Sequence, residues 1–114
     1  MYEIAMTLKS KEEGLYEKHT IDEYKCIKIS DDIFENLLTY LTNIEVYFPY
    51  REEWGKNIEL AGVTVVPFES LKIILNSVIT YLKKDYFNLY ELKELEIMLR
   101  QALEESKNII IFGI

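Results

Sequence analysis

The sequence contains very little cysteine and histidine, the residues that form disulfide bonds or bind metal ions in many small proteins. Among its 114 residues there is one cysteine, Cys26, and one histidine, His19. A single cysteine cannot form a disulfide within the chain, and by itself it cannot build a thiolate metal site. We therefore expect a fold that depends on the packing of apolar side chains, with no cofactor and no metal.

Long apolar runs are also missing. The run from Ile109 to Phe112 is short, and the apolar stretch from Leu71 to Leu82 is interrupted by Lys72. Both fall well short of the roughly 20 apolar residues that cross a bilayer. The first residues, Met-Tyr-Glu-Ile, lack the cationic start and apolar centre of a secretory signal. The sequence thus predicts no membrane-spanning segment and a cytoplasmic protein.

Positive charge is in short supply. The chain has 13 lysines and arginines against 20 aspartates and glutamates, which gives a formal net charge of −7. Binding to a phosphate backbone requires clustered basic residues, so direct contact with nucleic acid is not expected. A negative field instead speeds the encounter with positive surfaces, which favours a basic protein as the partner.

Catalytic and nucleotide-binding motifs are absent as well. The four glycines are isolated, so there is no phosphate-cradling loop, and neither Gly-x-Ser-x-Gly nor His-Glu-x-x-His occurs. This favours a non-enzymatic function. An enzyme that leaves no readable motif stays an alternative.

Three groups could carry chemistry in principle, but each has a structural explanation that we favour. His19 titrates near neutral pH, yet it lies in a charged loop and is expected to be a solvated surface residue. Cys26 follows Lys25, whose side chain should point to the other side of a strand, which favours a packed, unreactive thiol. Glu91 and Glu94 share a helix face without a histidine, so we interpret them as solvated.

What the chain does contain is ordinary globular composition, with 49% hydrophobic and 29% charged residues. No repeat, low-complexity run or linker divides it, so residues 1–114 are expected to form one domain. Alternation of apolar and polar residues predicts a strand over 2–8. The charged stretch 10–20, with Gly14, predicts the exposed end of a hairpin whose return strand includes Ile21 to Ile29.

Helical periodicity follows. Ser30, Asp31 and Asp32, with Glu35, supply N-cap chemistry for a helix that should run to about Asn43 or Glu45. Residues 58–66 predict a strand with a bulge, or a very tight hairpin. Pro67 suits the first turn of a second helix, which should end at Lys84, and a third should begin near an Asn88–Glu91 capping pair and end at about Lys107.

The continuous apolar run 109–112 predicts a strand buried on both faces or paired within a sheet. The fold class is therefore α+β: a small mixed or antiparallel sheet of about four strands, covered by three helices, in the order β-β-α-β-α-α-β.

The segment 46–57 has no clear periodicity and an unusual aromatic content, so we predict a loop. Its rings alternate with charges in Tyr47, Phe48, Pro49, Tyr50, Arg51, Glu52, Glu53 and Trp54. Tyrosine and tryptophan bury large areas at interfaces, and a charged rim around them is typical of an interaction patch. The alternative is that the rings fold over one end of the sheet as a lid on the core.

These features favour a non-enzymatic interaction module, an acidic inhibitor or immunity-type protein that binds and neutralises a basic partner such as a toxin. Its predicted contact residues are Tyr47, Tyr50, Arg51, Glu52, Glu53 and Trp54, with help from Asp31, Asp32 and Glu35. The composition is similar in type to that of small bacterial immunity proteins, but the chain carries no family motif.

Two alternatives stay open. The chain could be an assembly subunit that forms a homodimer by adding its apolar terminal strand to a neighbour's sheet, if that strand lies at an edge. It could also bind a small molecule in an aromatic pocket near the loop.

Overall fold

The computed structural model describes residues 1–41, 43–59, 61–84 and 89–113 and shows an α+β fold, as predicted. Six strands form one sheet in the order β2-β1-β6-β5-β3-β4, and every neighbouring pair is antiparallel. The prediction of about four strands and three helices was too low, because the described residues contain six strands and four α-helices. The strands are β1 (Tyr2–Met6), β2 (Ile27–Ile29), β3 (Val46–Phe48), β4 (Glu53–Gly55), β5 (Gly62–Val66) and β6 (Ile109–Gly113).

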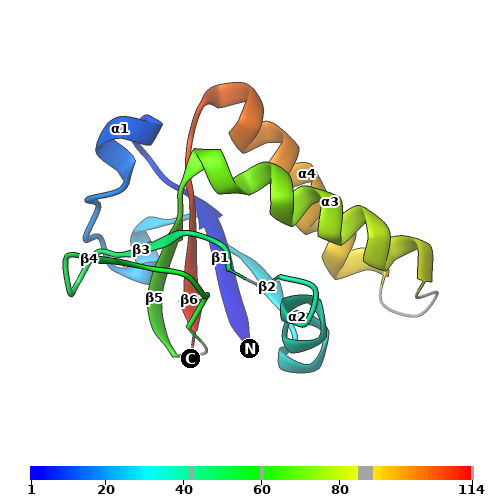
Figure 1. The fold of residues 1–114 in the computed structure, drawn as a ribbon. Helices are drawn as coiled ribbons and strands as arrows, with labels where there is room; N and C mark the ends of the chain where they lie inside the picture. The colour runs from blue at the N-terminus through cyan, green and yellow to red at the C-terminus, as the bar shows by residue number, and fades with distance from the viewer. Residues whose placement is uncertain (42, 60, 85–88, 114) are drawn as a thin grey trace.

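The last strand, β6, lies in the middle of the sheet between β1 and β5 (Figure 1). Ile109 to Phe112 are all buried, because alternate side chains point into the two faces and both faces are covered. The prediction of a doubly buried strand is confirmed. With a neighbour on each side, β6 has no free edge to add to another sheet.

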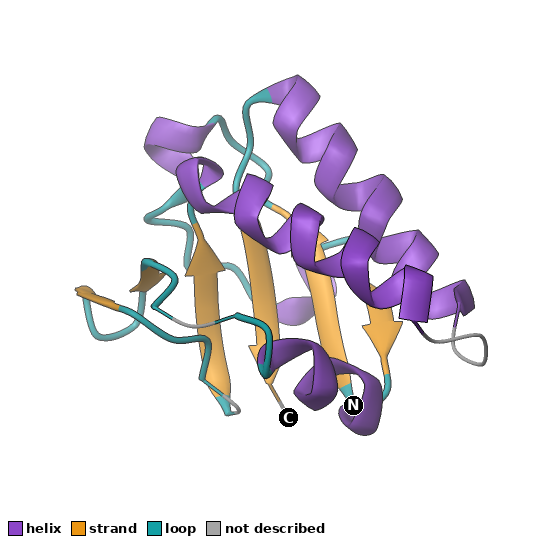
Figure 2. Cartoon of the chain, turned by 45° about the vertical axis from the view of Figure 1, so that its right-hand side comes forward, coloured by secondary structure: helices purple, strands orange, loops and turns teal. Residues whose placement is uncertain are grey.

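Helices cover one face of the sheet. Figure 2 shows α3 (Phe68–Lys84) and α4 (Leu89–Glu105) lying side by side across it, with α2 (Asp31–Leu38) at one end. Their apolar stripes and the facing strand residues form one continuous core that includes Ile4, Leu37, Leu71, Leu99 and Ile111. Among the described residues, no helix combines the length and apolar character that crossing a membrane requires.

The first long helix is shorter than predicted. It ends at Leu38, and the next turn is closed by i→i−3 bonds from the Tyr40 and Leu41 amides. Asn43 then adopts a left-handed backbone conformation with φ of 57°, which turns the chain toward β3. Leu41 and Ile44 are still buried, so the apolar spacing was real although the helix had ended.

The helix-cap predictions were only partly right. Ser30 precedes α2, but its side chain makes no capping bond to that helix. Its hydroxyl and its backbone N–H instead donate to Glu91 Oε2 of α4, at 3.2 and 3.1 Å. Glu91 thus joins two helices, and its proposed partner Asn88 lies outside the described residues.

The second face of the sheet is covered by residues 10–26, which the sequence predicted as an exposed hairpin end and return strand. The return strand is confirmed only for Ile27–Ile29, which pair antiparallel with β1, and the prediction was wrong for residues 10–26. The segment contains a short helix, α1 (Lys11–Gly14), and a 3-10 turn, Ile21–Glu23, and strand pairing begins only at Ile27. Leu15, Ile21 and Tyr24 pack against the sheet on this face.

The predicted loop 46–57 contains two of the additional strands. β3 and β4 form a hairpin, and β3 also pairs with β5 through Tyr47 and Val65. Residues 58–59 are not part of a strand, and β5 begins at Gly62, whose φ of 88° is readily available only to glycine. The strand in this region is therefore shorter than the predicted 58–66.

Candidate functional site

Three exposed rings and one buried ring gather on the second face, near the β4 edge. Tyr47 of β3 is 95% buried, and its ring makes edge contacts with Tyr16 at 5.6 Å and Trp54 at 5.1 Å between centroids. Trp54 is the cross-strand partner of Tyr47 in the β3–β4 register, which places the two rings on the same face. We call Tyr16, Tyr47, Tyr50 and Trp54 the aromatic patch.

Exposure divides the patch into a base and a surface. Tyr16, Tyr50 and Trp54 are 62%, 55% and 54% exposed, whereas Tyr47 is 5% exposed. The sequence suggested that this segment is either an interaction surface or a lid on the core. Residues 47–49 are buried and fit the description of a lid. Tyr50 and Trp54 remain available for contact. The packed base limits the freedom of the surface rings, which reduces the entropy lost when a partner binds.

The β3–β4 connection fixes the position of Tyr50. The Arg51 amide donates to the Phe48 carbonyl at 3.2 Å, which closes a turn with Pro49 at its second position, where the proline ring favours the required φ. Glu52 follows in a left-handed conformation with φ of 52° and leads into β4. The Tyr50 hydroxyl donates to the His19 carbonyl at 3.3 Å, so this turn also contacts segment 10–26.

The charged residues next to the patch form ion pairs on both faces of the β3–β4 hairpin. Arg51 lies 4.2 Å from the centroid of Phe48, a ring of the helical-face core, and makes ion pairs with Glu53 at 3.0 Å and Glu59 at 2.7 Å. These carboxylates raise the pKa of the Arg51 guanidinium, with the hydrogen bond to Glu59 as the main cause. Glu52 pairs with Lys18 of segment 10–26 at 3.3 Å. The Glu52–Lys18 pair thus borders the patch, whereas Glu53 is the cross-strand partner of Phe48 and lies on the other face from Trp54. Exposed ion pairs of this kind are weak in water and can exchange partners.

Of the six predicted contact residues, Tyr47, Tyr50 and Trp54 belong to the aromatic patch, Glu52 pairs with Lys18 beside it, and Arg51 and Glu53 lie with Phe48 on the other face of the hairpin. The prediction did not include Tyr16, whose ring contacts Tyr47. That ring comes from segment 10–26, which has no periodicity to reveal the face that it covers. The adjacent pair Leu15-Tyr16, the only two hydrophobic neighbours in that charged stretch, was the available signal. Lys18 is the other residue that the sequence did not connect with the patch.

The acidic residues of α2 do not join the patch. Asp31 forms an ion pair with the amino terminus of the chain, beside β1, and α2 directly follows β2. The patch lies at β3 and β4, toward the opposite end of the six-stranded order. The expected help from Asp31, Asp32 and Glu35 in the same contact is therefore not supported by their positions.

The other chemical candidates lie apart from the patch surface or are occupied. His19 Nδ1 lies 2.6 Å from Glu23 Oε2, and its ring contacts Tyr24. Cys26 is half-buried, and burial, followed by the charge of Glu3, raises the pKa of its thiol. A raised pKa lowers the thiolate fraction, which is unfavourable for a nucleophile. Within the described residues, no three potential ligands of the His, Cys, Asp and Glu types gather to hold a metal.

One buried carboxylate organises the segment beneath the patch. Glu17 is 5% exposed and accepts hydrogen bonds from the Leu8 and Lys9 amides at 3.1 and 2.6 Å and from the Tyr24 hydroxyl at 2.7 Å. Burial and this hydrogen bond raise the pKa of Tyr24. Because both oxygens of Glu17 are occupied, the group anchors segment 10–26 to the end of β1 and is not free for proton transfer.

Two shallow hollows border the aromatic patch. One, of about 360 Å³, is lined by Glu45, Trp54, Gly55 and Lys56, and the other, of about 290 Å³, lies beside Tyr50, Arg51 and Val63. Both are small for a ligand site, but they give the surface around the exposed rings a concave shape.

Comparisons of the chain with protein-family models, curated proteins and solved structures found no match.

Proposed function

We propose that this chain is a non-enzymatic binding domain of the inhibitor or immunity type, which docks a basic protein through the exposed rings of the aromatic patch. The observation that carries the proposal is the grouping of Tyr16, Tyr50 and Trp54 on one face over the buried ring of Tyr47. Large rings that are half-exposed and held on a packed base are the usual centre of a protein interface.

Charge supports a basic partner. The net charge of −7 accelerates encounter with a cationic surface over a distance of about one Debye length, roughly 8 Å at physiological salt. Next to the patch, Glu52 forms an exposed ion pair with Lys18. A lysine or arginine of the partner can replace Lys18 at little cost, because exposed ion pairs contribute about 0–1 kcal/mol. Steering then comes from the whole chain and affinity from the rings.

The test is a quantitative capture experiment with matched variants. Wild-type protein, Trp54→Ala/Tyr50→Ala and the control Tyr90→Ala, which alters an exposed ring on α4, are immobilised and exposed to lysate from the source cells at low and high salt. We expect one basic protein to be retained by wild type and control, lost at high salt, and reduced at least tenfold on the double variant.

A partner retained equally by the double variant and the control would overturn the patch as the docking site. If only acidic or neutral proteins are retained, and the double variant loses them, the patch is a docking site but the proposal of a basic partner is wrong. Circular dichroism and thermal unfolding of each variant establish that lost capture does not result from lost folding.

A further inference from the structure

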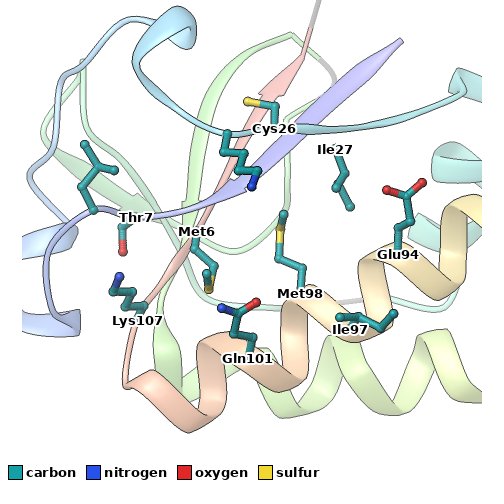
Figure 3. A pocket seen from close by; sticks show the side chains of 11 residues that line it. Met6, Thr7, Cys26, Ile27, Glu94, Ile97, Met98, Gln101 and Lys107 are labelled. Atoms are coloured by element: carbon teal, nitrogen blue, oxygen red, sulfur yellow. The ribbon is translucent and has the colours of Figure 1, made fainter.

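A further hollow lies between β1, the chain entering β2, and α4, toward the other end of the strand order from β3 and β4. It has a volume of about 570 Å³, which is within the range of roughly 300–1,000 Å³ usual for small-molecule sites. Figure 3 shows Met6 and Ile27 pointing from the strands toward α4, and Met98 and Gln101 pointing from α4 toward the strands. The sulfur of Cys26 points the other way, away from the helix.

The end of β1 at this hollow pairs with β6 but has no partner in the described β2 register. The β1–β2 register ends at Ile4 and Ile27. The Thr7 amide donates to the Asn108 carbonyl, so by alternation the odd residues of β1 bond toward β6 and the even residues toward β2. Met6 therefore directs its N–H and C=O toward β2, at the point where the β1–β2 register has ended.

The charges around the hollow favour an anion, although the chain as a whole is acidic. Two lysines, Lys25 and Lys107, and one carboxylate, Glu94, line it. Figure 3 places Lys107 beside Thr7 at one end and Glu94 at the other. Lys107 pairs at 3.5 Å with Glu105, and the other oxygen of Glu105 accepts a hydrogen bond from the Gln101 amide at 2.7 Å. Lys25, in contrast, makes no ion pair within the described residues, so it is the lysine that an anionic group can pair with.

We propose that this hollow binds a small amphipathic carboxylate, with its acyl chain between Met6, Met98 and Ile97 and its carboxylate toward Lys25. Methionine side chains adapt to flexible alkyl groups, and Ile97, which is 65% exposed, marks the open side. A peptide that paired with β1 as an added strand fits less well. It would have to insert between β1 and residues 25–27, which are joined by the chain that runs from β1 to β2.

Methionine methyl groups provide a direct test. The sequence has three methionines, of which Met6 and Met98 line the hollow and Met1 lies outside it. In protein with ¹³C-labelled methionine methyls, titration with sodium octanoate should shift the Met6 and Met98 signals saturably and leave Met1 unchanged. Hexanoate should bind up to about fifteenfold more weakly, since each buried methylene contributes a factor of about four.

Head-group and site variants complete the design. Octylammonium and octanol should bind at least about tenfold more weakly than octanoate, and Lys25→Gln should weaken octanoate about threefold to tenfold. Ile97→Glu should abolish most binding, whereas Ile73→Glu, at a comparably exposed isoleucine on α3, should not.

The proposal fails if octanoate produces no saturable shift, if Met1 shifts in parallel with the other two methyls, or if Ile97→Glu binds like Ile73→Glu. Equal affinity for octanoate and octylammonium would overturn the anionic head group. The site lies toward the opposite end of the sheet from the aromatic patch, so neither result bears on partner docking.

Discussion

The two faces of the sheet are covered by different means. On the helical face, α2, α3 and α4 bury a continuous apolar core whose members recur at helix and strand periods. On the second face, the cover is an irregular segment with a smaller apolar cluster and a buried carboxylate that accepts three hydrogen bonds. Packing holds the first cover, and specific polar contacts hold much of the second. The proposed interface lies on the second face.

The difference matters for function because a polar-anchored cover can present side chains that a helix would bury. Tyr16 remains 62% exposed while its neighbour Leu15 packs inward, and the Glu17 carboxylate fixes the segment immediately after them. Four changes test this comparison of the two faces, starting with the largest expected effect.

The helical face should be the most sensitive to truncation. Leu99 is fully buried at the centre of α4, so Leu99→Ala removes three buried carbons and leaves a cavity. We expect a loss of about 3–5 kcal/mol in the free energy of unfolding, measured by urea denaturation. Ile97→Ala, two residues away but 65% exposed, should cost less than about 1 kcal/mol. Equal costs would contradict the assignment of the core face.

The second face should depend on one carboxylate. Glu17→Ala leaves two amides and the Tyr24 hydroxyl without their acceptor, and we expect it to cost about 2–3 kcal/mol. Glu17→Gln retains one oxygen and the shape, so it should cost roughly half as much. The control is Glu13→Ala, at an exposed glutamate of α1, for which denaturation should detect about 0.5 kcal/mol or less. If Glu17→Ala lowers the free energy of unfolding as little as the control does, Glu17 does not anchor segment 10–26.

The anchor should also produce an alkaline limit to stability. The pKa of Tyr24 is raised in the folded state, so the protonated hydroxyl stabilises the fold. This contribution to the free energy of unfolding is complete below the ordinary tyrosine pKa of about 10. Above pH 10 the tyrosine of the unfolded chain ionises first, and at pH 11 the free energy of unfolding should have fallen by about 1.4 kcal/mol. Tyr24→Phe should remove this part of the decline, whereas Tyr90→Phe, at an exposed ring, should retain it. Parallel pH profiles for wild type and Tyr24→Phe would be contrary evidence.

The smallest effect is expected at the turn of the β3–β4 hairpin. Glu52 has a φ of 52°, a conformation that costs a residue with a Cβ about 1 kcal/mol or more and glycine very little. Glu52→Gly and Glu52→Ala both lose the ion pair with Lys18, so their difference isolates the backbone. We expect the glycine variant to be more stable by about 0.5–1 kcal/mol in thermal unfolding. Equal stability would show that the turn relaxes.

Much of the helical face could be predicted from the sequence. Periodicity located α3 within one residue at its start and at Lys84 at its end, and the apolar run of β6 predicted its burial on both faces. These elements are long or strongly patterned, and their local preference agrees with the final packing. The sheet order was not predictable, because it depends on contacts between strands far apart in the sequence.

The second face could not be predicted in the same way. Residues 10–26 have no sustained period, and the burial of Glu17 contradicts the usual position of a charged residue in a loop. Strands β3 and β4 have three residues each, too few for alternation to be recognised among closely spaced aromatic residues. The contact prediction used composition alone, so it named neighbours in the sequence and could not include Tyr16, which comes from another segment.

The most direct test of the central claim uses Trp54, the only tryptophan of the chain. Its indole is 54% exposed, so acrylamide should quench its fluorescence readily in the free protein. When the captured basic partner is added in a form without tryptophan, we expect the emission to shift to shorter wavelength and the quenching constant to fall at least twofold. Saturating binding that leaves both the emission and the quenching of Trp54 unchanged would contradict the docking of a partner on the aromatic patch.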